Sequence, residues 1–297
     1  MALGIGLGAS ACRAPAAAPP HSTEARVPYE TLRAQAPTRL TVHGPSTGAQ
    51  TLPPLPAGAE LITIQSGALA LQGWLALPPD AAERGPVPGL VYSHGAFALK
   101  IADWAVVQPA LDAGFAVLLP SLRGENGNPG HLELLAGEVD DTVAAAETLA
   151  AHPQVDGERI YALGHSVGGA IAALLSLRPD APVRLTGSVG GIYVPQTFVR
   201  WRAMKVNRAL VRFDVEDPNE LRLRSLLDNV TDMVHPHHAY IGDEDRWFHD
   251  NAAAVSAAAA RADVTHFVVH SVSGDHMSSL APGVAAFVAL ASEDAAR

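Results

Sequence analysis

One serine in this sequence stands in a pattern typical of a catalytic nucleophile. Ser166 is the central residue of Gly-His-Ser-Val-Gly at 164–168, which matches the G-x-S-x-G motif. A short apolar run at 160–163 precedes the motif and an Ala/Ile/Leu-rich run follows it, so we expect a tight turn from a strand into a helix. Such a turn exposes the serine, and the helix N-terminus faces any negative charge that forms beside it. The pattern therefore predicts that Ser166 is a nucleophile.

A serine hydroxyl attacks a carbonyl group only when a base removes its proton and a carboxylate holds that base in the right tautomer. Two later segments offer these groups. Asp245 closes an acidic turn at 242–245, and His276 follows a Gly-Asp pair, each after an apolar run. The carboxyl ends of parallel strands meet at one edge of a sheet. We therefore predict that His276 is the general base for Ser166 and that Asp245 orients it.

The acidic turn contains further carboxylates, which leaves alternatives open. Asp243 and Glu244 stand directly before Asp245, and a solvated acidic turn also fits this run. His276 is one of thirteen histidines. Because Gly242 lets the chain turn sharply, Asp243 is expected to follow the strand direction or face solvent, and Asp245 to face the histidine.

Two backbone N–H groups are predicted to hold the negative charge of a tetrahedral intermediate. One belongs to Val167, directly after the nucleophile. The other belongs to Ala96, in the loop that follows the apolar run at 89–93. His94 in the same loop is expected to be a hydrogen-bonded scaffold residue rather than a base.

The elements that must position these residues predict an α/β protein. Alternating apolar residues at 60–64 and 69–77 are typical of an antiparallel hairpin, and the later strands alternate with helices. This order implies a doubly wound, mostly parallel sheet. The later strands are expected at 89–93, 115–120, 160–163, 183–189, 238–241 and 265–269, and the helices at 102–113, 139–151, after Ser166, 250–261 and 284–290.

One catalytic domain with an N-terminal extension is expected. Residues 1–12 are apolar, end at the only cysteine, Cys12, and are similar to the end of a bacterial lipoprotein signal. Residues 13–58 are rich in Ala and Pro and predict a linker, either a tether or an arm that follows the surface. Residues 59–297 are the predicted catalytic domain, with a small cap at 192–234. We expect an exported protein, periplasmic or anchored through a lipid on the cysteine, with an uncleaved cytoplasmic form as the alternative.

Composition and charge also limit which classes of partner and ligand are expected. The net charge of −10 argues against nucleic acid, and a single cysteine excludes an internal disulfide. The histidines at 235–238, with Asp243 and His249, are interpreted as a loop entering a strand rather than a metal site, because HExxH-like spacing is missing. Seven of the twenty basic residues lie at 200–224. They are interpreted as a solvated cap face, or alternatively as a basic lid that favours an anionic or polar acyl group.

From about residue 60 to 290 the sequence resembles the α/β-hydrolase superfamily, in its prolyl-oligopeptidase-like and dienelactone-hydrolase-like branch. The resemblance is carried by 71–78, 93–95, 114–120, Arg123-Gly124 with Gly127 and Gly130, 139–141, the serine motif, 242–245 and Asp275-His276. It implies the α/β-hydrolase fold, a triad of Ser166, Asp245 and His276, and no cofactor or metal. Val167 stands where the family often has an aromatic residue, and the chain before residue 60 is too short for the β-propeller of prolyl oligopeptidases. These departures favour a small ester, thioester or lactone over a peptide.

The predicted function is therefore that of a carboxylesterase-like serine hydrolase, which cleaves a small-molecule acyl substrate through an acyl-enzyme. An exported serine peptidase or acyltransferase of the same fold is one alternative. A non-catalytic cell-surface binding protein on this fold is another. The intact set of serine, histidine and aspartate favours the enzyme.

Overall fold

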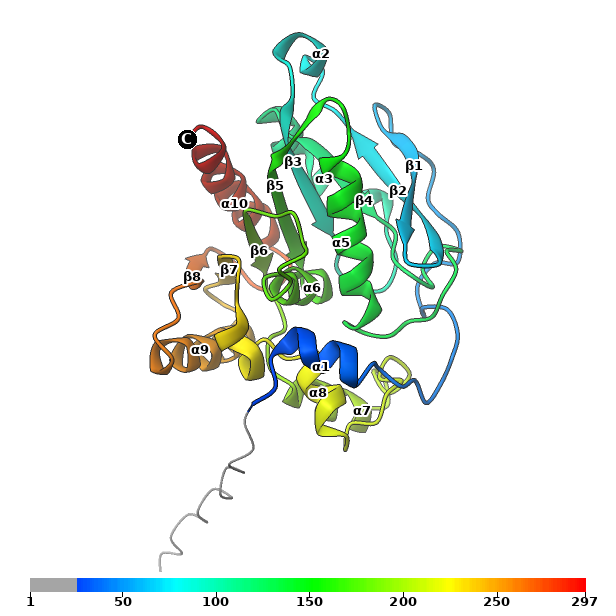
Figure 1. Cartoon of the computed structure of the whole chain (residues 1–297), viewed down its shortest axis with the longest axis vertical. Helices are drawn as coiled ribbons and strands as arrows, with labels where there is room; N and C mark the ends of the chain where they lie inside the picture. The colour runs from blue at the N-terminus through cyan, green and yellow to red at the C-terminus, as the bar shows by residue number, and fades with distance from the viewer. Residues whose placement is uncertain (1–25) are drawn as a thin grey trace, which may run out of the picture.

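The fold is described here from a computed structural model, which covers residues 26–297. The predicted signal remnant at 1–12 and its Cys12 lie outside the described residues. Within the described part of the chain, eight strands form one sheet in the order β1-β2-β4-β3-β5-β6-β7-β8 (Figure 1). The strands are β1 Glu60–Ser66, β2 Leu69–Ala76, β3 Val87–Ser93, β4 Ala116–Pro120, β5 Val155–His165, β6 Leu185–Val189, β7 His237–Gly242 and β8 Phe267–Val272.

The sheet is antiparallel at its start and parallel from β4 to β8. The hairpin of β1 and β2 pairs antiparallel, and β2 also runs antiparallel to β4. The six strands from β3 to β8 are parallel to their neighbours. Their carboxyl ends therefore share one edge of the sheet, as the sequence predicts. The predicted α/β-hydrolase fold is confirmed.

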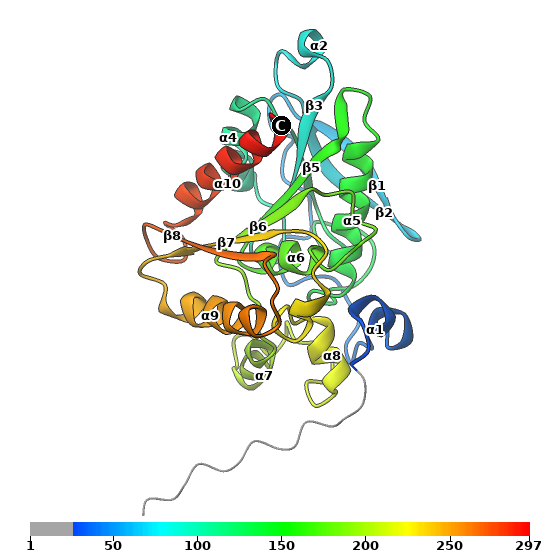
Figure 2. The same cartoon turned by 60° about the vertical axis from the view of Figure 1, so that its left-hand side comes forward.

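Helices cover both faces of the sheet (Figures 1 and 2). α5 and α6 pack on one face, and α10 with α4 packs on the other. Figure 2 shows α9 beside β7 and β8, with α7 below it. The helices are α1 Tyr29–Gln35, α2 Ala81–Arg84, α3 Ile101–Val106, α4 Gln108–Asp112, α5 Gly137–Ala150, α6 Val167–Leu175, α7 Gln196–Ala203, α8 Pro218–Leu223, the 3₁₀ helix η1 Leu227–Asp232, α9 Arg246–Arg261 and α10 Leu280–Ala295.

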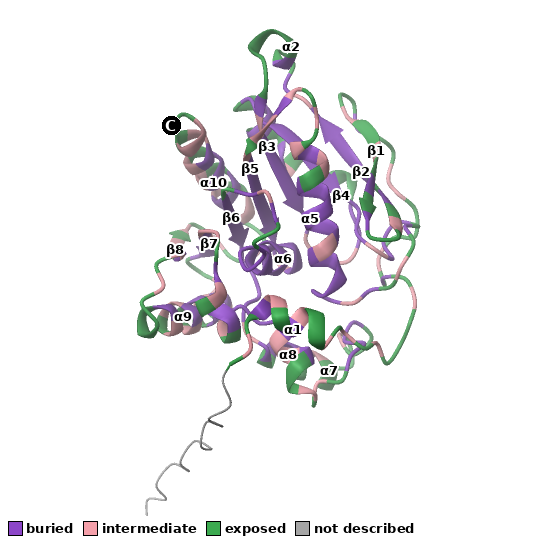
Figure 3. Ribbon diagram, viewed as in Figure 1, coloured by how far each residue is buried: buried purple, intermediate pink, exposed green. Residues whose placement is uncertain are grey.

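Strand β5 shows why the central strands are apolar at successive positions. Ile160 and Ala162 belong to the core under α5 and α6, whereas Tyr161 and Leu163 belong to the core under α10. Both faces of the strand are therefore buried, and an alternating polar pattern would place polar groups in one core. Figure 3 shows the same distribution, with buried residues along the central strands and exposed residues on the outer sides of the helices.

One predicted helix differs from the structure. The sequence predicts a single helix over 102–113, but the chain forms α3, then α4 from Gln108. Pro109 lies in the first turn of α4, where its missing N–H is tolerated. In a continuous helix the same proline would remove a hydrogen bond and clash with the preceding turn. The proline therefore starts a second helix.

Within the predicted linker segment at 13–58, helix α1 lies against the surface of the domain. Tyr29 and Leu32 of α1 are buried, and the Tyr29 hydroxyl donates to the carbonyl of Leu223 in α8 at 3.1 Å. Arg33 forms an ion pair with Asp140 of α5 at 2.7 Å. An Ala/Pro-rich composition predicts little packing by itself, but two apolar side chains and an arginine are enough to fix this segment to the surface.

None of the helices in residues 26–297 is both long and apolar enough to cross a membrane.

Candidate active site

Ser166 occupies a strained turn between β5 and α6. Its φ of 55° and ψ of −113° lie outside the regions that ordinary residues prefer. A Cβ at Gly164 would overlap the backbone of Gly168, and a Cβ at Gly168 would overlap the carbonyl of Ser93. Only glycine fits at these two positions, so the motif residues permit a turn this tight. The turn projects the serine from the carboxyl edge of the sheet, as the motif predicts.

The structure brings Ser166, His276 and Asp245 together. His276 Nε2 lies 3.1 Å from Ser166 Oγ, and His276 Nδ1 lies 3.3 Å from Asp245 Oδ2. The second contact is within ion-pair distance but is poorly aligned for a hydrogen bond. Contacts of this kind are often long without substrate and tighten when it binds. Burial lowers the pKa of His276 below its ordinary value, and the Asp245 carboxylate partly offsets this effect.

Asp243 and Asp245, which lie in the acidic turn at 242–245, have different partners. Asp245 N–H donates to the carbonyl of Gly242 at 2.9 Å, so the chain reverses before Asp245. Asp243 Oδ1 instead accepts a hydrogen bond of 2.8 Å from the N–H of Gly274. Asp243 therefore holds the loop that carries His276, and Asp245 is the carboxylate of this turn that contacts the imidazole.

Two aromatic rings enclose the imidazole of His276. The Phe248 ring of α9 stacks on it with centroids 4.2 Å apart and an interplanar angle of 7°. The His165 ring stacks with it at 4.9 Å and 28°. His165 Nε2 also donates to the carbonyl of His276 at 3.1 Å. The two rings fix the plane of the imidazole, and the π face of Phe248 favours a positive charge on it.

His165 is uncharged near neutral pH, because burial lowers its pKa to about 4. It therefore does not oppose a positive charge on His276.

Neither His165 nor Phe248 was predicted from the sequence to belong to the site. His165 lies inside the serine motif, where a stacking role has no sequence signature. Phe248 is one of two adjacent aromatic residues at the start of α9, and no motif marks it.

The predicted oxyanion donors lie in two different elements. Val167 is the first residue of α6, so its N–H has no partner inside the helix. Ala96 follows β3 with a φ of 63°, an unusual conformation for a residue with a side chain.

His94 lies in the same loop as Ala96 and donates from Nε2 to buried Glu125 at 2.9 Å. Burial lowers the pKa of His94, but the Glu125 carboxylate outweighs this and raises it to about 9. His94 is a scaffold of this loop in the structure.

A cavity of about 410 Å³ lies beside the serine and histidine. Ser166 and His276 line it together with Trp201 and Met204 from the predicted cap and with Trp247 of α9. The segment between β6 and β7 therefore forms a wall of the site. This size is in the ordinary range for small-molecule pockets.

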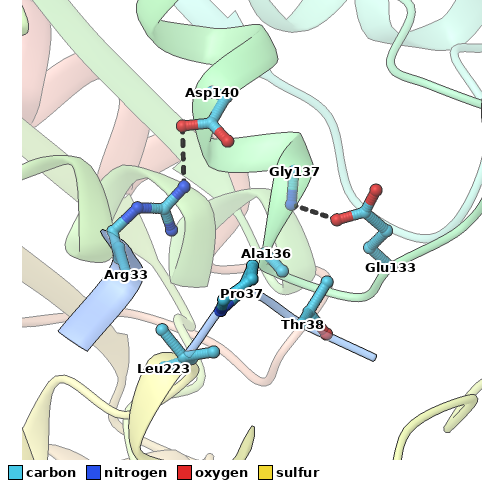
Figure 4. Close-up of a pocket in the computed structure, with 8 residues that line it drawn as sticks. All are labelled: Arg33, Pro37, Thr38, Glu133, Ala136, Gly137, Asp140 and Leu223. Atoms are coloured by element: carbon cyan, nitrogen blue, oxygen red, sulfur yellow. Dashed lines mark hydrogen bonds and ion pairs between the residues drawn. The ribbon is translucent and has the colours of Figure 1, made fainter. Parts of the chain in front are cut away.

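A separate cavity of about 270 Å³ lies between α1 and α5 (Figure 4). Its polar groups are already paired within the protein. Arg33 contacts Asp140 at 2.7 Å, and the N–H of Gly137 donates to Glu133 at 2.9 Å. Among the described residues, its lining contains no serine, cysteine or histidine, so the cavity of Ser166 is the better candidate for a substrate site.

The histidines at 235–238, near the start of β7, each contact a different group. His237 is buried between the hydroxyls of Thr186 and Ser188, His238 pairs with His270, and His235 contacts the carbonyl of Arg178. Over residues 26–297 the structure contains no group of three or more histidine, cysteine or acidic side chains arranged around a metal position.

Comparison with known proteins supports the fold described above. Residues 88–209 match the family described as the alpha/beta hydrolase fold. This range includes Ser166 and both predicted oxyanion donors. The match agrees with the α/β-hydrolase fold seen in the structure.

Individual relatives include proteins named as peptidases and as an esterase. An uncharacterized peptidase of Bacillus subtilis, YtmA, is 28% identical over 192 residues, which cover 61% of this chain and 71% of the relative. Dipeptidyl peptidase 4 of Porphyromonas gingivalis is 22% identical with a TM-score of 0.63, over 77% of this chain and 35% of that chain. Esterase Est22 is 17% identical with a TM-score of 0.60, over 80% and 81%. The structural matches show the shared fold, and this chain spans about a third of the dipeptidyl peptidase.

Proposed function

We propose that this protein is a serine hydrolase that cleaves a small carboxylic ester through an acyl-enzyme on Ser166. The observation that carries the proposal is the proximity of Ser166 Oγ, His276 and Asp245, with contacts of 3.1 and 3.3 Å. A nucleophile hydrogen-bonded to a base, which a carboxylate in turn contacts, is the arrangement that acyl transfer requires.

In the first half-reaction, Ser166 Oγ attacks the acyl carbon and its proton moves to His276 Nε2. Asp245 holds the opposite ring nitrogen and stabilises the positive imidazolium. The N–H groups of Val167 and Ala96 are the proposed donors to the oxyanion. When the intermediate collapses, the bond between the acyl carbon and the alcohol oxygen breaks, and the alcohol leaves with the proton from His276.

In the second half-reaction, water replaces the alcohol. His276 takes a proton from the water as the hydroxide adds to the acyl carbon, and it returns that proton to Ser166 Oγ when the acid is released. Neither step needs an oxidant, a reductant or another co-reactant. The cavity of about 410 Å³ beside Ser166 supports a small acyl substrate.

The serine variant tests this proposal. Ser166→Ala is expected to reduce hydrolysis of short p-nitrophenyl esters by roughly 10⁴-fold and to abolish labelling by a fluorophosphonate probe. The fold should persist, because alanine keeps the Cβ that the turn already accommodates. Retention of more than about a tenth of the activity by a clean preparation of this variant would refute the assignment.

Peptide hydrolysis is the second candidate, and the name of the Bacillus subtilis relative favours it. The same acyl-enzyme chemistry would release an amine instead of an alcohol. Acetyl and butyryl esters, compared with dipeptide p-nitroanilides in one series, distinguish the two. Efficient peptide cleavage without ester cleavage would reverse our preference.

A further inference from the structure

Two residues of α7 carry polar groups that the proposed chemistry does not use. Thr197 and Arg200 are three residues apart, so they share one face of the helix. Both line the cavity of Ser166, and both also line an adjoining cavity of about 280 Å³. Trp247 of α9 borders the same two cavities, and Figure 2 shows α7 below α9. The two cavities therefore share the walls that these residues form.

Thr197 is only 2% exposed, and its Oγ1 has no hydrogen-bond partner among the described residues. Buried side-chain hydroxyls are paired in the large majority of cases. The unpaired hydroxyl of Thr197, a residue that lines the cavity of Ser166, is therefore a candidate partner for a polar group of the substrate. A threonine hydroxyl can donate one hydrogen bond to an anion while its methyl group faces apolar neighbours.

Arg200 is an uncompensated cation beside the same cavity. Within residues 26–297 no carboxylate lies within ion-pair distance of its side chain, in contrast to Arg178 and Arg224, which are paired. No acidic residue lines the cavity of Ser166, where His276 is the only other titratable group. Asp250 lines the adjoining cavity, so an anion is favoured on the side of Ser166.

We propose that Thr197 and Arg200 form a subsite for a carboxylate on the substrate, so that the enzyme prefers esters with an anionic group. This inference rests on the proposed ester hydrolysis. A guanidinium group binds a carboxylate through two parallel hydrogen bonds, which a lysine does not reproduce. Arg200 is exposed to solvent, and Trp201 and Trp247 form apolar walls beside it.

Two matched ester pairs test the subsite in the full-length enzyme. In the first pair, the p-nitrophenyl monoester of adipic acid is compared with that of adipamic acid, which replaces the free carboxylate with a neutral amide. In the second pair, 4-carboxyphenyl butyrate is compared with 4-carbamoylphenyl butyrate. We expect kcat/KM to favour the anionic member of one pair by at least about tenfold. The pair that responds identifies whether the acyl or the alcohol part occupies the subsite.

Variants of Thr197 and Arg200 test whether these residues cause the preference for anionic esters. Arg200→Ala should lower the anionic-to-neutral ratio by at least about tenfold, Arg200→Lys should retain part of it, and Thr197→Val should lower it severalfold. Asp250→Asn should raise the ratio, because a neighbouring negative charge is removed. Arg202→Ala is the matched control, since Arg202 lies on the same helix but does not line either cavity.

Two outcomes would overturn the subsite while leaving ester hydrolysis intact. One is a ratio near unity for both pairs in the wild-type enzyme. The other is an equal loss of preference in Arg202→Ala and Arg200→Ala, which would indicate a general surface-charge effect. Failure of the proposed function looks different, because neither neutral ester would then be cleaved and Ser166 would not react with a fluorophosphonate.

Discussion

At the scale of single residues, the site depends on which carboxylate contacts His276. Asp245 Oδ2 lies 3.3 Å from Nδ1 of the imidazole, while Asp243 is hydrogen-bonded to the backbone of Gly274. The two residues are separated by one position and have the same chemistry. Their backbone surroundings, rather than their side chains, give them different tasks.

This separation predicts different effects for two conservative variants. Asp245→Asn should lower kcat/KM on a short ester by about 10³- to 10⁴-fold, because the imidazole loses the carboxylate that controls its tautomer. Asp243→Asn should change it by less than about threefold, because the asparagine Oδ1 still accepts from Gly274. A greater loss in Asp243→Asn than in Asp245→Asn would show that the turn is assigned wrongly.

The pH dependence of the same two enzymes provides a further test. The base must be neutral to accept the serine proton, so the acidic limb of kcat/KM reports the pKa of His276. Burial lowers this pKa and Asp245 raises it. The midpoint of the wild-type acidic limb should therefore lie below about pH 6.5. The midpoint for the residual activity of Asp245→Asn should lie at still lower pH. A wild-type midpoint above about pH 7 would contradict this assignment.

At the scale of elements, the strand ends set how closely the loops approach the imidazole. Gly190 directly follows β6 and has a φ of 56°. A Cβ at this position would lie 2.7 Å from His276 Nδ1 and 2.9 Å from its Cε1. The end of β6 thus limits the position of the imidazole on the side where Asp245 contacts it.

A pair of glycine variants separates this steric effect from backbone strain. Gly190→Ala should lower kcat by at least about tenfold, because the new methyl group displaces the imidazole. Gly67→Ala is the matched control, since Gly67 lies in the β1-β2 turn with a φ of 54°, and a methyl group added there would meet no neighbouring atom within 4 Å. Both variants should lose about 1–2 kcal/mol of unfolding free energy. Full activity of Gly190→Ala would contradict the proposed contact.

At the scale of the whole molecule, a buried carboxylate lies where α5 meets the cap. Glu138 Oε1 accepts from the N–H groups of Glu133 and Leu134 at 2.7 and 3.0 Å. Arg224 of the cap segment donates to the carbonyl of Leu134 at 2.6 Å. Burial, together with the nearby Glu133 carboxylate, raises the pKa of Glu138 to about 7. The loop at 133–134 therefore contacts both α5 and the segment predicted to be a cap.

This raised pKa predicts a loss of stability at alkaline pH. The folded state binds the proton more tightly than the unfolded state, so the contribution of Glu138 is complete below the unfolded pKa and is lost as the pH rises through about 7. Between about pH 6 and about pH 8.5, wild type should lose about 1 kcal/mol more unfolding free energy than Glu138→Gln. Urea unfolding at both pH values measures this difference, with Glu147→Gln on the exposed side of α5 as the control. Equal pH slopes for wild type and Glu138→Gln would refute it.

Much of the fold follows from local sequence patterns. The alternating residues of the hairpin, the continuous apolar run of β5 and the serine motif each depend on neighbours a few positions apart, so periodicity and glycine spacing predict them. The order of serine, aspartate and histidine along successive strand ends also follows from sequence, because parallel strands end at a common edge. These patterns are sufficient to predict Ser166, His276 and Asp245 as one group.

The tertiary structure alone determined the contacts between distant segments. Ser166 and His276 are 110 positions apart, and the Phe248 ring reaches the imidazole only because α9 packs beside β7 and β8. The same is true of Tyr29, whose burial and hydrogen bond to Leu223 of α8 hold α1 against the domain. Sequence periodicity describes which face of an element is apolar, but not which partner covers it. The partner depends on how the elements pack in three dimensions. This packing places the aromatic rings around His276 and forms the cavity beside Ser166.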